Sequence, residues 1–146
     1  MSGTKIENLV RAIIEKGYVM SLATLDDGGL WISDVMYVAD DNLVLYWISE
    51  VAVRHSKAIH TNPGVAASIT TNQKGEPSEG LQLTGIAEKI EGNLFEIEKK
   101  LFIKKSKPQP TVPGVVFESK RGYSWYKFTP KKIRLNCHRE FGYVKQ

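Results

Sequence analysis

The chain has 146 residues, of which 42% are apolar and 25% charged; this ordinary globular composition excludes extended disorder, and the length suits one domain, residues 1–146. No apolar run approaches the roughly 18 residues of a membrane helix, and the N-terminus lacks a signal-like segment, so we expect a cytoplasmic protein. A single cysteine, Cys137, excludes an intrachain disulfide, and the net charge of +4 is compatible with an acidic ligand without requiring one.

The first half of the chain is typical of one helix followed by three strands. Apolar residues between Ile6 and Ile14 recur at helical spacing, and Gly17 can end this helix as its C-cap. The turn sequence Asp26–Gly29 separates two runs of strand composition, and a third run follows Asp40–Asn42. The predicted strands are residues 18–25, 31–39 and 43–49. On tight turns these strands would form an antiparallel meander.

The second half adds helices and further strands. Residues 53–61 have helical composition, and Asn62-Pro63 ends this helix because a residue before proline avoids the helical conformation. Later segments are predicted as strands 65–72 and 80–90, a helix within 93–105, a proline-rich loop or lid at 107–114, and strands 122–129 and 131–137. The pattern predicts a mainly β fold, a closed or nearly closed β-barrel with flanking helices.

An anion site is predicted where the third strand meets the second helix. Arg54 and His55 fall in the first helical turn, where unpaired amides and the helix dipole favour a small anion. Arg54 can add a bidentate guanidinium contact, His55 a ring N–H group, and Ser49 a hydroxyl. An arginine near a helix start is more often a solvated charge, so these residues by themselves leave both interpretations open.

The order of these elements resembles the FMN-binding split β-barrel of the pyridoxamine 5'-phosphate oxidase-like superfamily, a Greek-key-like fold. In that family a hairpin precedes a strand ending in Ser or Thr, a basic pair opens a helix, and Asn-Pro precedes a core strand. Here these places are held by Ser49, Arg54-His55 and Asn62-Pro63, and the resemblance covers residues 18–91. The ending "FTPKKIRLNCHREFGYVKQ" is similar to the tail of a small, poorly characterised bacterial branch of the family.

The resemblance implies a homodimer with two FMN molecules in grooves where the subunits meet. Arg54 and His55 would hold the FMN phosphate with help from Ser49. Backbone groups of residues 33–36 would lie along the isoalloxazine, which Ile48 would also border. The implied FMN-binding residues are Ser33, Asp34, Val35, Met36, Ile48, Ser49, Arg54, His55 and Gln82.

Three positions depart from the family pattern. Gln82 resembles a glutamine that some members place near the flavin, although the expected position is Gly80, two residues away on the same strand face. His55 stands where many members have lysine, which predicts weaker or more pH-dependent binding. The C-terminal Arg and His that hold the substrate phosphate of the true oxidases have no counterpart, because His138-Arg139 lies in a different context. We therefore do not expect oxidation of pyridoxamine phosphate.

In function, the resemblance implies an oxidoreductase that passes a hydride or electrons between NADH or NADPH and a small acceptor. The flavin carries such chemistry itself, so no catalytic residue is assigned, and Asp34 is the nearest ionisable group to the expected ring position. A flavin carrier or redox sensor without turnover remains an alternative. So does replacement of FMN by a related flavin or a haem.

A basic barrel that binds single-stranded nucleic acid is a further alternative. Its stacking platform would be the aromatic residues between Tyr123 and Phe128, close to Lys120, Arg121 and Lys127. These aromatic residues alternate between the two faces of a strand, whereas a platform needs one face, so we favour the flavin interpretation. No metal site is expected, because the histidines and Cys137 lack the spacing of a ligand set.

Overall fold

The computed structural model describes residues 3–92, 94–105 and 122–141, with side chains from residue 5 onward. The predicted loop at 107–114 lies outside the described residues. In chain order the elements are α1 (Gly3–Lys16), β1 (Val19–Asp26), β2 (Gly29–Met36), β3 (Val38–Ala39), β4 (Leu45–Glu50), α2 (Arg54–Thr61), β5 (Gly64–Thr70), β6 (Glu79–Ile90), α3 (Phe95–Lys104), β7 (Tyr123–Cys137) and α5 (His138–Phe141). No helix in this part of the chain is long and apolar enough to cross a membrane.

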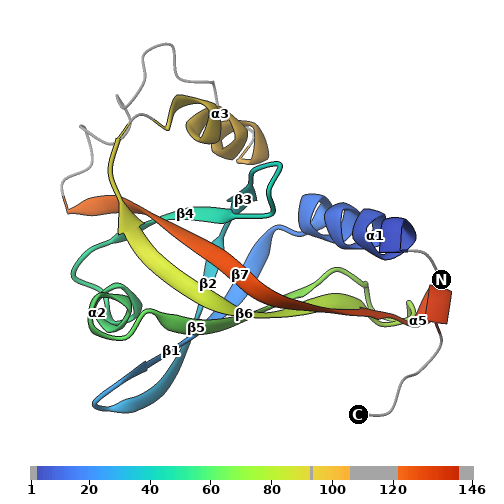
Figure 1. Cartoon of the computed structure of the whole chain (residues 1–146), viewed down its shortest axis with the longest axis horizontal. Helices are drawn as coiled ribbons and strands as arrows, with labels where there is room; N and C mark the ends of the chain where they lie inside the picture. The colour runs from blue at the N-terminus through green and yellow to red at the C-terminus, as the bar shows by residue number, and fades with distance from the viewer. Residues whose placement is uncertain (1–2, 93, 106–121, 142–146) are drawn as a thin grey trace.

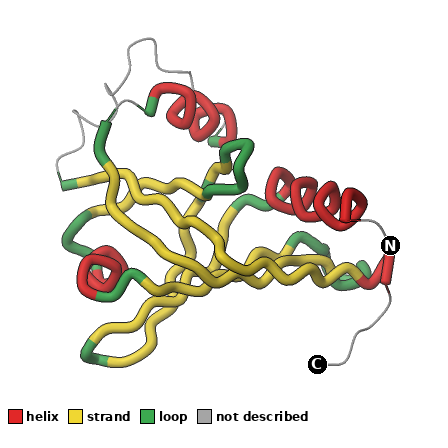
Figure 2. The backbone as a smooth tube through the Cα atoms, in the orientation of Figure 1, coloured by secondary structure: helices red, strands yellow, loops and turns green. Residues whose placement is uncertain are grey.

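One antiparallel sheet of seven strands forms the body of the molecule, in the order β2-β1-β5-β6-β7-β4-β3. The sheet curls strongly, with α1, α2 and α3 set around it (Figure 1). The tube view shows β6 and β7 as the long strands that cross the middle of the molecule (Figure 2). The mainly β barrel-like fold with flanking helices that the sequence predicts is confirmed.

The predicted three-strand meander is correct only in part. β1 and β2 do form the expected hairpin, paired from Val19↔Met36 to Asp26↔Gly29. The third predicted strand, β4, pairs with the short β3, which is the end of the predicted second strand, and on its other side with β7. The predicted strand 31–39 is divided at Tyr37, whose buried side chain donates a hydrogen bond from its hydroxyl to the carbonyl of Ile14, at 2.7 Å. The chain changes direction at Tyr37, so β2 pairs with β1 whereas β3 pairs with β4.

The C-terminal part of the sheet also differs from the prediction, since the two predicted strands are one continuous strand, β7. Its pairing with β6 runs from Ile90↔Trp125 to Glu79↔Cys137 and shifts register between Thr84 and Gly85. Thr84 pairs with Lys132 and Gly85 pairs with Pro130, which leaves Lys131 as the extra residue of a bulge. A proline has no N–H to give to a ladder, and a bulge is one of the places where a strand tolerates it.

The core fills the inside of the curled sheet. Its largest fully buried side chains include Trp47, Tyr37 and Phe128, and the Trp47 ring stacks on Tyr126 with centroids 5.7 Å apart. The apolar face of α1 adds buried side chains to this core, namely Val10, Ile13 and Ile14. A second, smaller cluster lies under α3. It consists of Val38, Leu101 and Trp125 with Met36, Tyr46, Ile48, Ile90, Leu94 and Ile97 packed against them.

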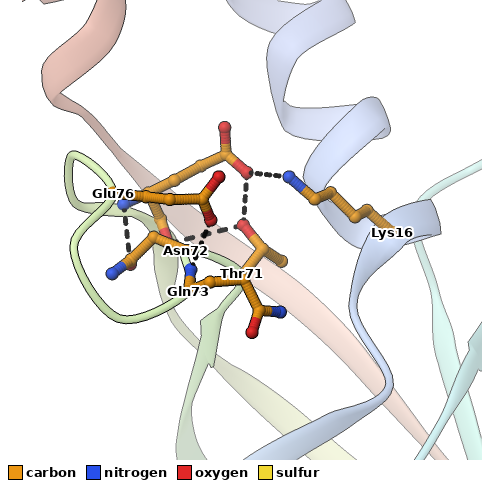
Figure 3. A network of polar contacts seen from close by, with 6 residues as sticks. Lys16, Thr71, Asn72, Gln73 and Glu76 are labelled. Atoms are coloured by element: carbon orange, nitrogen blue, oxygen red, sulfur yellow. Dashed lines mark hydrogen bonds and ion pairs between the residues drawn. The ribbon is translucent and has the colours of Figure 1, made fainter.

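A polar network joins the end of α1 to the β5–β6 hairpin (Figure 3). The hydroxyl of Thr71 and the ammonium of Lys16 both donate to the Oε1 atom of Glu79, the latter at 3.0 Å. The backbone N–H of Glu79 donates to the side-chain oxygen of Asn72, also at 3.0 Å. These contacts, led by the Thr71 hydrogen bond, hold the pKa of the Glu79 carboxyl below its usual value.

Replacing Glu79 with glutamine should lower the free energy of unfolding by about 1 kcal/mol at pH 7. A carboxylate with a depressed folded pKa stabilises the protein above its unfolded pKa, and this contribution disappears as the pH falls through the folded pKa. The difference between wild type and E79Q in urea unfolding should therefore shrink from pH 7 to pH 3. An equal difference at both values would contradict this account, and E96Q, in an exposed pair with Lys99, is the control.

Candidate functional site

Ser49 and His55 meet where β4 gives way to α2. The hydroxyl oxygen of Ser49 lies 2.9 Å from Nε2 of His55, so the two predicted residues form one hydrogen-bonded pair. Ser49 is buried and His55 is half-buried. Burial lowers the pKa of the His55 ring, because desolvation disfavours the cation. Without an anion beside it, His55 is therefore mainly neutral near pH 7.

Arg54 points to a different element, the β1–β2 hairpin. Its Nε and Nη2 atoms donate to the two carboxylate oxygens of Asp26, at 2.9 and 3.0 Å. The guanidinium carbon lies 4.4 Å from the centroid of the Trp31 ring, in a cation–π contact. The hydrogen bond with Arg54 is the main cause that lowers the pKa of Asp26, so the carboxylate is ionised and the pair is neutral overall. Asp26 and Trp31 are site residues that the sequence analysis missed.

The pairing leaves Arg54 able to bind a further anion. A guanidinium has five N–H donors, and Asp26 occupies one edge of the fork through two of them. The opposite edge, which includes Nη1, has no contact with Asp26. Arg54 also borders a hollow with Asp26, Lys57 and Ala58. A phosphate in this hollow would meet a guanidinium whose orientation Trp31 and Asp26 already fix.

The start of α2 has further unsatisfied polar groups. Its N-cap residue, Val53, makes no side-chain capping hydrogen bond. The hydroxyl of Ser56 is buried and has no hydrogen-bond partner among the described residues. Such groups suit a ligand with several acceptor oxygens. The residues at this helix start therefore fit the phosphate of FMN in chemical type.

The predicted ring-contacting residues lie in three different surroundings. Val35 is buried in the main core, and Ser33, two residues away, faces the same side of β2. Met36 and Ile48 both pack against the cluster under α3. Asp34 faces the opposite, outer side of the sheet, where its carboxylate accepts a hydrogen bond from the Ser21 hydroxyl at 2.7 Å. The structure thus does not bring the four β2 residues to one surface through their side chains.

The outer side of the sheet carries a polar row across five strands. Strand pairing places these residues side by side in the order Asp34, Ser21, Ser68, Gln82 and Arg134. Most of the row borders a groove of about 410 Å³, whose floor includes the small side chains Ala23 and Ala66. Ser21, Ser68 and Arg134 were missed from the sequence. Strand alternation indicates the face of each residue, but register across strands is needed to align them.

Gln82, and not position 80, is the residue of β6 that can present an amide on this face. A Cβ atom at Gly80 would overlap the carbonyl oxygen of Ile69 and approach the Cα of Thr70 to 3.4 Å. Gly80 and Gln82 point to the same face because they are two residues apart. The groove beside Gln82 and the hollow beside Arg54 are separate cavities of the single chain.

Comparisons with known proteins concern the fold and a few distant relatives. No protein-family model matches the chain. The UPF0306 protein YhbP of Salmonella schwarzengrund is 22% identical over 111 residues, which cover 72% of this chain and 73% of the relative. The UPF0306 protein plu4501 of Photorhabdus laumondii is 22% identical over 101 residues, covering 68% of this chain and 71% of the relative.

Solved structures identify the fold. A candidate pyridoxamine 5'-phosphate oxidase of Listeria innocua superposes with a TM-score of 0.68 and 22% identity, over 89% of this chain and 97% of that one. HutZ, the heme storage protein of Vibrio cholerae, superposes with a TM-score of 0.68 and 13% identity, over 88% of this chain and 93% of that one. An F420 reductase superposes with a TM-score of 0.64 and 19% identity, over 85% of this chain and 94% of that one. The chain has the split β-barrel fold of pyridoxamine 5'-phosphate oxidase-like proteins, as its sequence resemblance predicts.

Metal ligation finds no support in the side chains. Within residues 5–92, 94–105 and 122–141, no three His, Cys, Asp or Glu side chains converge on a point where they could hold an ion.

Proposed function

We propose that the protein is a cytoplasmic FMN-binding oxidoreductase that acts as a homodimer. The observation that carries this proposal is the uncapped start of α2, where Arg54 and the Ser49–His55 pair lie at one strand-to-helix junction of a split-barrel fold. The fold supports binding of a redox cofactor, since relatives of this shape include a candidate pyridoxamine 5'-phosphate oxidase and a reductase.

In this proposal the residues of the chain bind and orient the cofactor. Arg54, His55 and Ser49 hold the phosphate, with first-turn amides of α2 as further donors. Met36 and Ile48 are apolar neighbours of the ring and limit its access to water. When bound, FMN supplies hydride or electron transfer between NADH or NADPH and a small acceptor. Gln82 lines the outer groove, where the acceptor or the nicotinamide would bind, and Asp34 lies beside Ser21 in the same polar row.

The outer face of β2 supports the homodimer. Leu30 is 79% exposed and Ile32 is 66% exposed, and both belong to the edge strand of the sheet. Apolar side chains on a free edge favour contact with another protein surface. A second copy of the chain over this face would cover Ile32 and close the groove beside Gln82.

Replacing Ile32 with lysine should weaken this dimer at least about tenfold, because a buried charge would replace an apolar contact. Light scattering after size-exclusion chromatography should give twice the chain mass of 16.4 kDa for the wild type and a lower mass for I32K. The control is I103K, at an exposed apolar residue of α3. A monomeric wild type, or an I32K protein that stays dimeric at every concentration, would contradict the proposal.

Cofactor identity can be tested by absorbance after each of three compounds is added and the excess removed. FMN should be retained and riboflavin lost, because riboflavin lacks the phosphate. Hemin is the third compound, since one protein of this fold stores heme. Retention of hemin in place of FMN would overturn the choice of cofactor. Oxidation of NADH or NADPH by the FMN-loaded protein, with varied acceptors, then separates an enzyme from a flavin carrier or sensor.

Of the four aromatic residues predicted as a stacking platform for nucleic acid, only Tyr123 has an exposed side chain, at 39%. Trp125, Tyr126 and Phe128 are buried in the two core clusters, so their rings cannot stack on bases. Of the basic residues invoked with them, Lys127 is in an ion pair with Glu88. Lys120 and Arg121 lie outside the described residues.

FMN affinity should depend on the pH through His55. An adjacent phosphate favours the imidazolium, so binding raises the pKa that burial has lowered, and the His55 contribution grows as the pH falls from 8 towards 6. The ratio of the dissociation constants of H55Q and wild type should therefore be larger at pH 6 than at pH 8. Taking the ratio cancels the titration of the phosphate itself. The same ratio at both pH values would contradict the assignment of His55 to the FMN phosphate.

A further inference from the structure

Two lysines of α3 bind backbone carbonyls beside the last strand of the sheet. Nζ of Lys100 donates to the carbonyl of Ala39 at 2.9 Å, and Nζ of Lys104 donates to the carbonyl of Tyr37. Lys100 and Lys104 are four residues apart on a helix, which separates them by about 6 Å along its axis. Tyr37 and Ala39 are two residues apart in extended backbone, which separates their carbonyls by about 6.7 Å. The spacing of the two lysines therefore matches the spacing of the two carbonyls. This match forms a pair of similar contacts along the edge strand β3.

The two lysines have different surroundings. Lys100 is exposed, whereas Lys104 is half-buried, with its Nζ 3.7 Å from the centroid of the Tyr37 ring. Both border a cavity of about 330 Å³ between α1, β3 and α3. The apolar part of its wall is Ile14, Val38, Ala39 and Ile103. Lys104 therefore combines a partly desolvated amine with an adjoining space large enough for a small molecule.

The charged and titratable groups that face Lys104 come from each element packed around it. Glu15 of α1 lines the same cavity, Lys100 lies one turn away on α3, and the Tyr18 ring lies 5.9 Å from Nζ. Burial lowers the pKa of Lys104 to about 8, although Glu15 acts in the opposite direction. Burial also raises the pKa of Tyr37, so this phenol stays neutral and donates to Ile14. The lowered pKa thus leaves a larger share of the Lys104 amine uncharged near neutral pH than in an exposed lysine.

We propose that Lys104 is a covalent binding site for a small neutral aldehyde, which it takes as an imine in the cavity between α1 and α3. Its N–H bond to the Tyr37 carbonyl directs the nitrogen lone pair of the free amine away from that carbonyl. Lysines desolvated in apolar pockets are the usual amines of such chemistry. The site is independent of the proposed flavin function.

The reaction is a condensation without a redox step. Nζ attacks the carbonyl carbon, the C–N bond forms, and a proton passes from nitrogen to the carbonyl oxygen. Loss of that oxygen as water then gives the C=N bond, so amine and aldehyde yield imine and water. The Glu15 carboxylate, on the same cavity, can relay the protons. Its negative charge and the apolar wall favour a neutral aldehyde over an anionic one.

The test is reductive trapping on the full chain at pH 7.5, with butyraldehyde and cyanoborohydride, followed by peptide mass spectrometry. Lys104 should be alkylated at least about tenfold faster than Lys100, which makes the matching carbonyl contact but is exposed. The preference should disappear in urea. Equal rates in the folded protein, or a preference that persists in urea, would overturn the proposal.

Two further comparisons test the chemistry of the cavity. Glyoxylate, an anionic aldehyde, should react more slowly at Lys104 than butyraldehyde, and a faster reaction would overturn the class of ligand. In E15Q, imine formation should slow, while acylation of Lys104 by an N-hydroxysuccinimide ester, which needs no dehydration, should not. Equal slowing of both reactions would assign Glu15 a structural role and remove it from the proton relay.

Discussion

Replacing Arg54 with alanine should weaken FMN binding by at least about tenfold, because it removes a bidentate donor from the phosphate. The same reasoning predicts the opposite effect on FMN binding for a change at its partner, Asp26. Changing Asp26 to asparagine leaves the guanidinium with an uncompensated charge, so the phosphate should bind more tightly than in the wild type. Titration of flavin fluorescence measures both dissociation constants under the same conditions.

The control for charge alone is R11A. Arg11 is a surface guanidinium on α1 that contacts Glu7 and the carbonyl of Asp41, remote in sequence from α2. It should leave the dissociation constant unchanged within about twofold, since long-range attraction is screened by salt. If R54A and R11A weaken binding equally, Arg54 contributes general charge and no specific contact. Weaker binding by D26N would show that Asp26 serves the site by orienting Arg54 and does not compete with the ligand.

Replacing Gly85 with alanine should destabilise the fold by about 2 kcal/mol or more, because no space exists for a methyl group at the bulge. A Cβ atom there would overlap the carbonyl oxygen of Thr129 and lie 2.9 Å from the Cα of Pro130. These are backbone atoms of the paired strand, so relief requires the ladder itself to move. Chemical denaturation should show the loss as a lower midpoint.

Gly64 provides the matched comparison, since it is also a strand glycine. The nearest atom to an added Cβ is the side-chain oxygen of Asn62 at 3.6 Å, an ordinary contact. G64A should therefore change stability by less than about 0.5 kcal/mol, or raise it by reducing the entropy of the unfolded chain. A G85A protein as stable as G64A would show that the bulge can relax, contrary to the expected rigid register.

Local patterns in the sequence were sufficient for most elements but not for their arrangement. Helical spacing from Val10 to Ile14 and the turn at Asp26–Gly29 depend on neighbouring residues, and both predictions are confirmed. The single strand β7 was predicted as two, 122–129 and 131–137, because the bulge that accommodates Pro130 forms with Gly85, far away in sequence. The meander was incomplete for a similar reason, because the pairing of β4 with β7 joins segments that the sequence does not mark as partners.

The candidate site likewise combines contacts that local sequence predicts with contacts that depend on the fold. The Ser49–His55 pair is six residues apart and spans one strand-to-helix junction, so its proximity followed from local structure. The contact of Arg54 with Asp26 joins residues 28 apart and could not be predicted from spacing. Residues 33–36 were assigned together by resemblance, yet strand alternation turns Asp34 away from Ser33 and Val35. Their roles towards FMN stay predictions.

The two ends of the sheet have different consequences for assembly. At one end, α3 lies along β3, where Lys100 and Lys104 occupy carbonyls that another strand would need. At the other end, β2 offers its backbone and the apolar side chains of Leu30 and Ile32. A protein with two open edges can add copies head to tail without limit, as fibres do, whereas one open edge can pair with its own copy and then stops. At the β3 edge, the lysines of α3 thus act against the addition of a further strand.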